Sequence, residues 1–376
     1  MRVIVCPDSF TGTLSAAEAA SAISDGWLTA RPDDAVISIP QSDGGPGFVD
    51  ALHGALGGQV HTQVVSDPLG RDIEAHWLLV GDTAYIESAS ASGLHLLAGE
   101  ERNPAITSTY GVGQLLASAI AFGARKVVVG LGGTSTNDAG AGLLAALGAT
   151  ATDLDSQDAT HLLASGGLGL KDIGAVDLTV ATTLLHGVTV EVATDVDNPL
   201  LGLRGATNTF APQKGASTEL VMQLEGAIEH FAQVLGRRAD GKSAAVALGS
   251  GAAGGLGFAL LHLGAHRSAG IDRIMEVSGL TAALPSADLV ITGEGSFDWQ
   301  SLSGKVVTGV ARLALEVGVP VVVIAGQVDL GRREWQSIGV HGVYSLTEMV
   351  GEDEAMGQAA DSLSRAAARV SRTWGR

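Results

Sequence analysis

The chain has 376 residues, a length that suits about two domains, and it carries 22 Lys and Arg against 40 Asp and Glu, a net charge of −18. A charge of this sign repels phosphate polymers and anionic lipid surfaces, so we expect neither a nucleic-acid partner nor a membrane partner. Apolar residues make up 46% of the chain and charged residues 16%, which excludes a disordered acidic protein and predicts a globular fold.

The first elements of the chain alternate between strand and helix. Residues 2–6 form a short apolar run typical of a buried strand, and Ser15 and Glu18 have the spacing of a capping box that opens a helix ending near residue 30. Residues 35–39 predict a second strand, and residues 49–56 predict a second helix. This order is typical of a parallel sheet.

The same order returns near the other end of the chain. Residues 287–292 and 319–325 predict buried strands, and residues 305–317 and 354–374 predict helices. We therefore expect an α/β fold in which a Rossmann-like domain with a parallel sheet is built from both ends of the chain.

The stretch between these two parts has a different texture. It begins at the turn Asp67-Pro-Leu-Gly70, includes an alternating strand at residues 73–80, and holds most of the Gly-rich loops. We expect residues 1–66 and 285–376 to form the Rossmann-like domain, interrupted by an inserted mixed α/β domain of residues 67–284.

Cysteine usage and apolar runs bear on the compartment. The single cysteine, Cys6, excludes an intrachain disulfide, and the apolar start of the chain reaches Asp8 too soon for a signal peptide. The uncharged run at residues 243–266 is broken by paired glycines and carries His262, which indicates a loop and a buried helix rather than a membrane span. A cytoplasmic location is the expectation.

Two nucleotide-binding motifs match the chain only in part. Gly236-Arg-Arg-Ala-Asp-Gly241-Lys242-Ser243 fits the Walker A pattern, but residues 218–235 before it have helical rather than strand spacing. Gly249-Ser-Gly251-Ala-Ala-Gly254 fits the dinucleotide pattern, yet residues 262–272 offer no second strand ending in an acid. We interpret the first as a surface loop and disfavour a nicotinamide enzyme.

Two loops that follow predicted strands carry candidate ligands. Asp8 and Ser9 come directly after the first strand, where they can bind a metal ion or a hydroxyl group. Glu294 and Asp298 follow the strand at residues 287–292 and precede Lys305, a set that suits Mg²⁺ and nucleotide phosphates. Ordinary solvated turns are the alternative at both places.

A third loop, Gly130-Leu-Gly-Gly133 with the hydroxyls and Asn137-Asp138 that follow, is dense in small residues. Glycines let backbone N–H groups face an anion, and the hydroxyls add donors. Asn137 and Asp138 can alternatively cap the next helix. The density of small residues favours phosphate binding.

A fourth loop contains Asp195 and Asp197, separated by one residue. In an extended segment both carboxylates point to one side, as a Mg²⁺ site or a general base with its orienting partner requires. Asx turns before Pro199 are the alternative.

Taken together, these motifs resemble those of the bacterial glycerate kinases of the type I family, from Met1 to the C-terminal helix. The resemblance is carried by motifs that occur in the same order in the chain: Pro7-Asp-Ser-Phe10, Ser42-Asp-Gly-Gly45, Thr109-Tyr-Gly-Val-Gly113, Gly130-Leu-Gly-Gly133 with Asn137-Asp138, Asp195-Val-Asp197-Asn-Pro199, Pro212-Gln-Lys-Gly215, Gly251-Ala-Ala-Gly-Gly-Leu-Gly257 and Ile291-Thr-Gly-Glu-Gly295. It implies a cytoplasmic, nucleotide-binding transferase that phosphorylates D-glycerate with ATP and Mg²⁺, usually to 2-phosphoglycerate, in a cleft between two domains.

With the resemblance, each candidate residue receives an expected role. The expected catalytic residues are Asp195, Asp197 and Lys214. The expected substrate-binding residues are Asp8, Ser9, Asp43, Arg204 and Gln213. The expected nucleotide-binding residues are Gly132, Gly133, Thr134, Asn137, Asp138, Gly254, Gly255 and Lys305. The expected metal ligands are Asp195, Asp197, Glu294 and Asp298.

The chain departs from the family pattern at two positions. Thr11 stands where the family commonly has lysine, and Pro46 stands where it commonly has glutamate. A kinase for another small hydroxy acid, or a catalytically degenerate nucleotide-binding relative, is therefore the alternative. Which aspartate is the base and which oligomer forms, a homodimer included, are left open.

Overall fold

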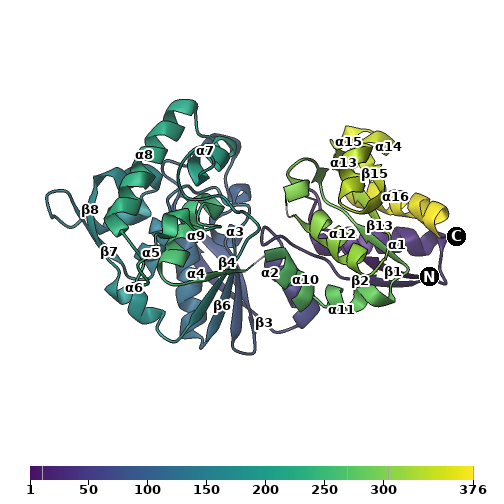
Figure 1. Ribbon diagram of the computed structural model, residues 1–376, viewed down its shortest axis with the longest axis horizontal. Coiled ribbons are helices and arrows are strands. Elements are labelled where there is room, and N and C mark those ends of the chain that lie inside the picture. The colour runs from purple at the N-terminus through teal and green to yellow at the C-terminus, as the bar shows by residue number, and fades with distance from the viewer. Residues whose placement is uncertain (11, 269, 304, 376) are drawn as a thin grey trace. The chain divides into compact units, whose positions relative to one another are not determined.

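The computed structural model describes residues 1–10, 12–268, 270–303 and 305–375, so Thr11 lies outside the described residues. The chain forms two compact units, each drawn in Figure 1. Unit 1 comprises Met1–Asp43, Asp50–Gly57 and Ile271–Arg376, and unit 2 comprises Gly44–Val49 and Gly58–Gly270.

Unit 1 is built on a five-stranded parallel sheet in the order β15-β13-β11-β1-β2. The strands are β1 (Arg2–Val5), β2 (Ala35–Ser38), β11 (Leu289–Thr292), β13 (Val321–Ala325) and β15 (Val340–Ser345). In β1, Val3 pairs with Leu289 of β11 on one side and with Val36 of β2 on the other. The predicted parallel sheet, built from both ends of the chain, is confirmed.

Helices cover both faces of this sheet, because alternate residues of β1 point to opposite sides. Val3 and Val5 belong to a cluster with residues of α1 (Ala16–Ala30) and α16 (Ala359–Trp374), and these two helices pack against each other (Figure 1). Ile4 and Cys6 belong to a second cluster with residues of α12 (Val306–Glu316). Cys6 therefore fills the core of unit 1.

The remaining elements of unit 1 lie toward the end of the chain. They are α11 (Leu280–Ala283), β12 (Ser296–Phe297), β14 (Gln327–Val328), α13 (Arg332–Ser337), α14 (Leu346–Val350) and α15 (Glu352–Gly357). Two helices span the borders between the units in the sequence, α2 (Phe48–Leu56) and α10 (Gly270–Val277).

The predicted capping box of α1 is confirmed, whereas one predicted helix is not continuous. The Ser15 side chain accepts a hydrogen bond from Glu18 N, and the Glu18 carboxylate accepts one from Ser15 N. The helix predicted at residues 354–374 is divided at Gln358, which has non-helical φ and ψ of −134° and 46° between α15 and α16. Hydrophobic spacing alone does not reveal such a break.

Unit 2 is built on a six-stranded mixed sheet in the order β10-β9-β6-β5-β4-β3. The strands are β3 (Gln59–Ser66), β4 (Asp72–Val80), β5 (Thr83–Glu87), β6 (Lys126–Gly130), β9 (Thr189–Ala193) and β10 (His266–Ser268). Strands β5, β6, β9 and β10 are parallel, and β4 is antiparallel to both β3 and β5. Strand β3 therefore ends at the same edge of the sheet as β5, β6 and β9.

The core of unit 2 lies between this sheet and several helices. Val127 and Val129 of β6 belong to a large apolar cluster with residues of α4 (Tyr110–Ala121), α5 (Ala141–Ala146) and α9 (Ala252–His262). The other elements are α3 (Ala89–Ser92), β7 (Thr150–Asp153), β8 (Ile173–Asp177), α6 (Thr179–Leu184), α7 (Ala206–Phe210) and α8 (Thr218–Leu235). In the part of the chain that is described, no helix has the length and apolar character needed to span a membrane.

The borders between the two units lie at other positions in the sequence than expected. Sequence analysis predicts borders after residues 66 and 284, whereas the units change near residues 57 and 270. Strand β3 pairs with β4 in the sheet of unit 2, and Met275 is buried in the core of unit 1. Pairing with distant strands, which local patterns do not show, determines where each unit begins.

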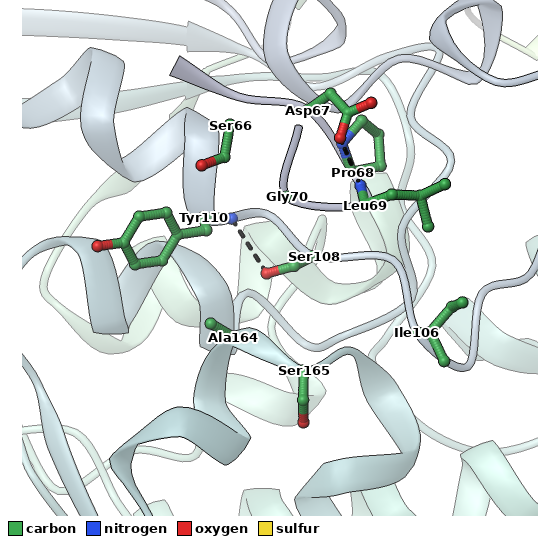
Figure 2. A pocket seen from close by; sticks show the side chains of 10 residues that line it. All are labelled: Ser66, Asp67, Pro68, Leu69, Gly70, Ile106, Ser108, Tyr110, Ala164 and Ser165. Carbon is green, nitrogen blue, oxygen red and sulfur yellow. Dashed lines mark hydrogen bonds between the residues drawn. The ribbon is translucent and has the colours of Figure 1, made fainter. Parts of the chain in front are cut away.

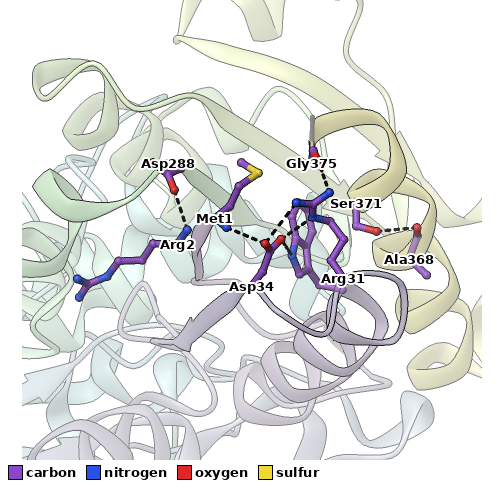
Figure 3. A network of polar contacts seen from close by, with 9 residues as sticks. Met1, Arg2, Arg31, Asp34, Asp288, Ala368, Ser371 and Gly375 are labelled. Atoms are coloured by element: carbon purple, nitrogen blue, oxygen red, sulfur yellow. Dashed lines mark hydrogen bonds and ion pairs between the residues drawn. The ribbon is translucent and has the colours of Figure 1, made fainter.

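A buried carboxylate joins the start of the chain to α1 and to the end of the chain in unit 1 (Figure 3). The Asp34 carboxylate accepts hydrogen bonds from the N-terminal amine at 2.6 Å, from Arg31 Nε at 2.5 Å and from Trp27 Nε1 at 3.0 Å. Arg31 also donates to the carbonyl oxygen of Gly375. The hydrogen bonds from Arg31 and the amine hold the pKa of Asp34 well below its usual range.

We expect the substitution Asp34→Asn to lower the free energy of unfolding by about 2 kcal/mol at neutral pH, the scale of hydrogen bonds to charged groups. Because the folded-state pKa of Asp34 is depressed, this stabilisation exists above the unfolded value of about 3.9 and is lost as the pH falls below it. Urea unfolding at several pH values measures the effect. Asp33→Asn at the exposed neighbouring residue serves as control. An equal loss of stability in Asp33→Asn would contradict the assignment.

Candidate functional site

The Gly-rich loop after β6 is organised by one buried carboxylate. Asp138 accepts hydrogen bonds from Thr109 N and Thr109 Oγ1, both at 2.8 Å, from Gly140 N at 3.0 Å and from Gly142 N at 3.2 Å. Burial raises the pKa of Asp138, and the hydrogen bonds from Thr109 oppose that rise. Asp138, one of the predicted nucleotide ligands, therefore binds backbone N–H groups at the start of α5, whose N-cap residue is Gly140.

Lys214 reaches into the same loop from a short 3-10 helix, Pro212–Lys214. Only 3% of its surface is exposed, and Nζ donates to Thr136 O at 2.7 Å and to Thr134 Oγ1 at 3.3 Å. Burial lowers the pKa of Lys214 to about 7, and the nearby charge of Asp138 opposes the shift. The structure thus places predicted Lys214 beside predicted Thr134 and Asp138.

A second Gly-rich segment packs directly on this loop. Residues Ala253, Gly254 and Gly255 have left-handed φ angles of 53°, 68° and 90° within the first turns of α9. A Cβ atom on Gly254 would lie 1.9 Å from Thr136 O, so no larger residue fits there. The contact brings the predicted Gly254 and Gly255 against the loop that holds Lys214.

Two buried oxygen atoms at this contact have no hydrogen-bond partner in the described part of the chain. They are Thr136 Oγ1 and Asn137 Oδ1, and the Asn137 Nδ2 atom donates to Thr207 Oγ1 at 3.1 Å. An unsatisfied buried polar atom is costly, and it is typical of places where a water molecule or ligand supplies the partner. These atoms support the prediction that the loop binds a ligand.

The two aspartates after β9, Asp195 and Asp197, lie in different surroundings. The Asp197 side chain is 68% exposed and forms an ion pair with Arg267 Nη2 at 2.7 Å. Arg267 Nε also donates to Thr194 O at 3.1 Å, so the arginine bridges both sides of this segment. Asp195 is half-buried.

Two predicted substrate ligands of unit 2 are exposed. Both Arg204 and Gln213 present exposed side chains, and the described contact of Arg204 is its carbonyl oxygen, which accepts from Asn198 Nδ2 at 2.7 Å. Their roles toward a substrate stay predictions.

The segment Gly44–Val49 covers the start of the Gly-rich loop within unit 2. A Cβ atom on Gly133 would lie 2.7 Å from Cδ of Pro46, so this departure from the family pattern packs on the loop itself. The buried Glu87 carboxylate at the end of β5 accepts from Gly47 N at 2.9 Å. Glu87 thereby positions the segment.

Unit 1 holds a separate group of acids at the ends of β1 and β11. Burial raises the pKa of Asp8 well above its usual range, and the charges of Asp43 and Glu294 add to the rise. Burial also raises the pKa of Glu294 to about 7, opposed by Lys305, whose Nζ lies 3.8 Å from Glu294 Oε2. Glu294 Oε1 is buried with no hydrogen-bond partner among the described residues.

The other predicted residues of unit 1 have local contacts. Ser9 N donates to Asp8 Oδ1 at 2.7 Å, and Asp298 Oδ1 accepts from Gln300 N at 2.8 Å. Within the described ranges, no three His, Cys, Asp or Glu side chains are close enough to hold a metal ion by themselves. The metal roles of Asp195, Asp197, Glu294 and Asp298 therefore stay predictions.

Four residues that shape these sites escape sequence analysis as individual ligands. Thr109 holds Asp138, Thr207 holds Asn137, Arg267 holds Asp197, and Glu87 holds the segment before α2. Each partner lies tens of residues away along the chain, so local spacing gives no signal. The position of Thr109 within Thr109-Tyr-Gly-Val-Gly113 is the only hint.

The chain resembles known proteins over nearly its whole length. The model of the Glycerate kinase family matches residues 3–375. A glycerate kinase of Bacillus subtilis (strain 168) is 41% identical, with 93% of this chain and 90% of the relative covered. A glycerate 2-kinase of Escherichia coli (strain K12) is 38% identical, with 99% and 98% covered.

The fold agrees with a solved structure. A crystal structure described as a candidate glycerate kinase 2 from Salmonella typhimurium LT2 aligns with a TM-score of 0.81 and 37% identity, covering 99% of this chain and 98% of that chain. The fold and the relatives together place the chain in a family of kinases. The chain belongs to the glycerate kinase family.

The burial of Lys214 predicts a pH-dependent stability. Its pKa of about 7 in the folded state lies below the unfolded value of about 10.4, so the unfolded chain binds more protons between these values. We expect the stability of the wild type relative to Lys214→Met to rise as the pH increases from about 7 to about 10, measured by chemical denaturation. Exposed Lys242→Met serves as control, and a difference that is flat with pH would contradict the shifted pKa.

Proposed function

We propose that this protein transfers the γ-phosphoryl group of ATP to D-glycerate and forms 2-phosphoglycerate, with Mg²⁺ bound to the nucleotide. The observation that carries the proposal is the buried Lys214 ammonium, held against the Gly-rich loop at the carboxyl end of β6. Ligands bind at this edge of parallel sheets, and backbone N–H groups of Gly-rich loops suit phosphate. The names of the relatives from Bacillus subtilis and Escherichia coli support glycerate as acceptor and its 2-hydroxyl as the reacting group.

Lys214 is equipped to hold a phosphate oxygen. An ammonium has three N–H donors, and Thr136 O and Thr134 Oγ1 take two of them. The remaining donor is available to a ligand. Phosphoryl transfer proceeds through a loose transition state, in which positioning and neutralisation of charge provide most of the catalysis.

Asp195 is the residue that we assign to accept the proton of the substrate. Asp195 is half-buried just after β9, whereas the Asp197 side chain is 68% exposed, so of the two aspartates Asp195 is better shielded from water to act as base. The 2-hydroxyl oxygen forms a bond to the γ-phosphorus, the bond from that phosphorus to the β,γ-bridging oxygen breaks, and ADP leaves. The hydroxyl proton moves to the Asp195 carboxylate.

The acids of unit 1 fit a divalent cation and a polyol. Glu294 Oε1 is a buried oxygen without a hydrogen-bond partner among the described residues. The charge of Asp43 raises the pKa of Glu294, and the charge of Glu294 raises the pKa of Asp8, so the three carboxylates lie near one another. Mg²⁺ prefers oxygen ligands, usually keeps several waters and needs only one or two carboxylates. When bound, Mg²⁺ would supply positive charge to the phosphate oxygens. Asp8, Ser9 and Asp43 are proposed to bind substrate hydroxyls.

Several further expectations stay predictions. They are a homodimer and a cytoplasmic location. Arg204 remains proposed as the clamp of the substrate carboxylate, because its planar guanidinium can bind a carboxylate through two hydrogen bonds.

A direct assay tests the function. We expect ADP release from purified protein with Mg-ATP to depend on D-glycerate, with L-glycerate, glycolate and tartronate as comparison acids, and phosphorus NMR to place the phosphate on carbon 2. Asp195→Asn should lower kcat on the order of 100-fold or more, because it removes the general base. Asp33→Asn should keep full turnover. Turnover with another acid alone would change the substrate, and no turnover by folded protein that binds ATP would indicate a degenerate relative.

Binding of the nucleotide should also change the protonation of Lys214. A phosphate next to the ammonium favours its charged form, so at pH 7 we expect uptake of roughly half a proton per ATP bound. Calorimetry in buffers of different ionisation enthalpy measures this number. The uptake should vanish in Lys214→Met and persist in Lys242→Met, and an unchanged uptake in Lys214→Met would remove the lysine from the phosphate site.

A further inference from the structure

Unit 2 contains a cavity of about 390 Å³ to which no role has been assigned, shown in Figure 2. Its walls are formed by the turn Asp67-Pro-Leu-Gly70 and by the segment at residues 106–110. Its lining consists of Ser66, Asp67, Pro68, Leu69, Gly70, Ile106, Ser108, Tyr110, Ala164 and Ser165. A cavity of this size suits one small organic molecule.

The lining selects for an uncharged group. None of its ten residues, all within the described chain, is Lys, Arg or His, so the cavity offers no cation to a phosphate or carboxylate. Its single acid, Asp67, is nearly fully buried and is paired with Arg71 Nε at 2.5 Å. The other lining residues provide an apolar surface and several hydroxyl groups. This combination suits a ligand that has a flat heterocyclic ring and hydroxyl groups.

Hydrogen bonds hold both walls of the cavity in place. Asp67 Oδ1 accepts from Leu69 N at 2.8 Å and from Arg71 N at 2.9 Å, which fixes the turn. Ser108 N donates to the Pro68 carbonyl oxygen at 2.9 Å, which ties the two walls together. A site whose walls are already ordered binds with a smaller entropic cost.

One wall of the cavity is shared with the Gly-rich loop. Ile106, Ser108 and Tyr110 line the cavity, whereas the intervening Thr107 and Thr109 donate to Ser135 O at 3.0 Å and to Asp138 Oδ2 at 2.8 Å. The other wall follows β3, which ends at the same edge of the sheet as β6. Alternate residues of the segment 106–110 therefore face the cavity and the loop that holds Lys214. Both lie at the edge of the sheet where parallel strands place ligands.

We propose that this cavity binds the uncharged base and ribose of the nucleotide whose phosphates lie against the Gly-rich loop and Lys214. The inference rests on the proposed function, which assigns residues to the phosphates and none to the base. Stacking against the Tyr110 ring and the apolar wall would hold the base, and the hydroxyl groups would bond to its edge and to the ribose.

The test is the substitution Ile106→Trp, which places a larger side chain in the lining of the cavity. Ile106 is 52% exposed, so the larger side chain does not disturb a core. Met222→Trp on the exposed face of α8 is the matched control, because Met222 is 66% exposed and remote from the cavity in sequence. Calorimetry would measure the binding of ATP, of adenosine and of inorganic tripolyphosphate to each protein.

We expect Ile106→Trp to weaken the binding of ATP and adenosine at least tenfold, to leave tripolyphosphate binding unchanged, and to raise the KM for ATP with little change in kcat. Unchanged ATP affinity in Ile106→Trp, with glycerate-dependent turnover intact in the wild type, would overturn the base site alone. So would a neutral ligand that binds in the cavity without competing with ATP. Failure of the wild type to bind ATP would overturn both the base site and the proposed function.

A second measurement does not depend on any variant. Photolabelling of the wild type with 8-azido-ATP should modify peptides that contain residues 66–70 or 106–110, with excess adenosine suppressing the label. Labelling confined to other peptides would contradict the proposal.

Discussion

Unit 2 depends on one close backbone contact, in which the carbonyl oxygen of Thr136 lies where a side chain at position 254 would begin. The same oxygen accepts the hydrogen bond of Lys214 Nζ. The left-handed turn at the start of α9 therefore does more than pack two loops, because it fixes the direction of a carbonyl group that holds the buried ammonium. Ala253 and Ala139 share this left-handed conformation without being glycine, which is strain typical of functional loops.

The electrostatics of the two units follow from burial. The chain is strongly acidic as a whole, yet its clearest candidate for phosphate binding is a lysine removed from water. Desolvation disfavours the ammonium, and Asp138 offsets part of that cost. In unit 1 the same desolvation acts on Asp8 and Glu294 and favours their protonated forms. Each unit thus holds groups whose charge would change when an oppositely charged ligand enters.

Local patterns were enough to predict β1, β2, β4, β11 and β13, the capping box at Ser15 and the Gly-rich loop, because these depend on residues close together in sequence. Strands β3, β5, β10 and β15 were not predicted from these patterns. The family followed from motifs in order and is confirmed. Long-range partners could not be predicted. The residues around Asp138 do not predict its contact with Thr109, and those around Asp197 do not predict its contact with Arg267, because each contact forms only after distant segments pack. The pairing of β3 with β4 likewise determined a border that hydrophobic spacing does not mark.

The discontinuity of unit 1 has a consequence for how the chain matures during synthesis. Strand β1 is paired on both sides in its sheet, and Arg2 N donates to Asp288, 286 residues later in the sequence. All of unit 2 is synthesised before β11 exists, and proteins emerge from the ribosome from the N-terminus onward. The first strand must therefore wait, with one edge unpaired, until most of the chain has been translated. During that interval the apolar segment around Ile4 is exposed, and an unpaired strand edge of this kind favours aggregation.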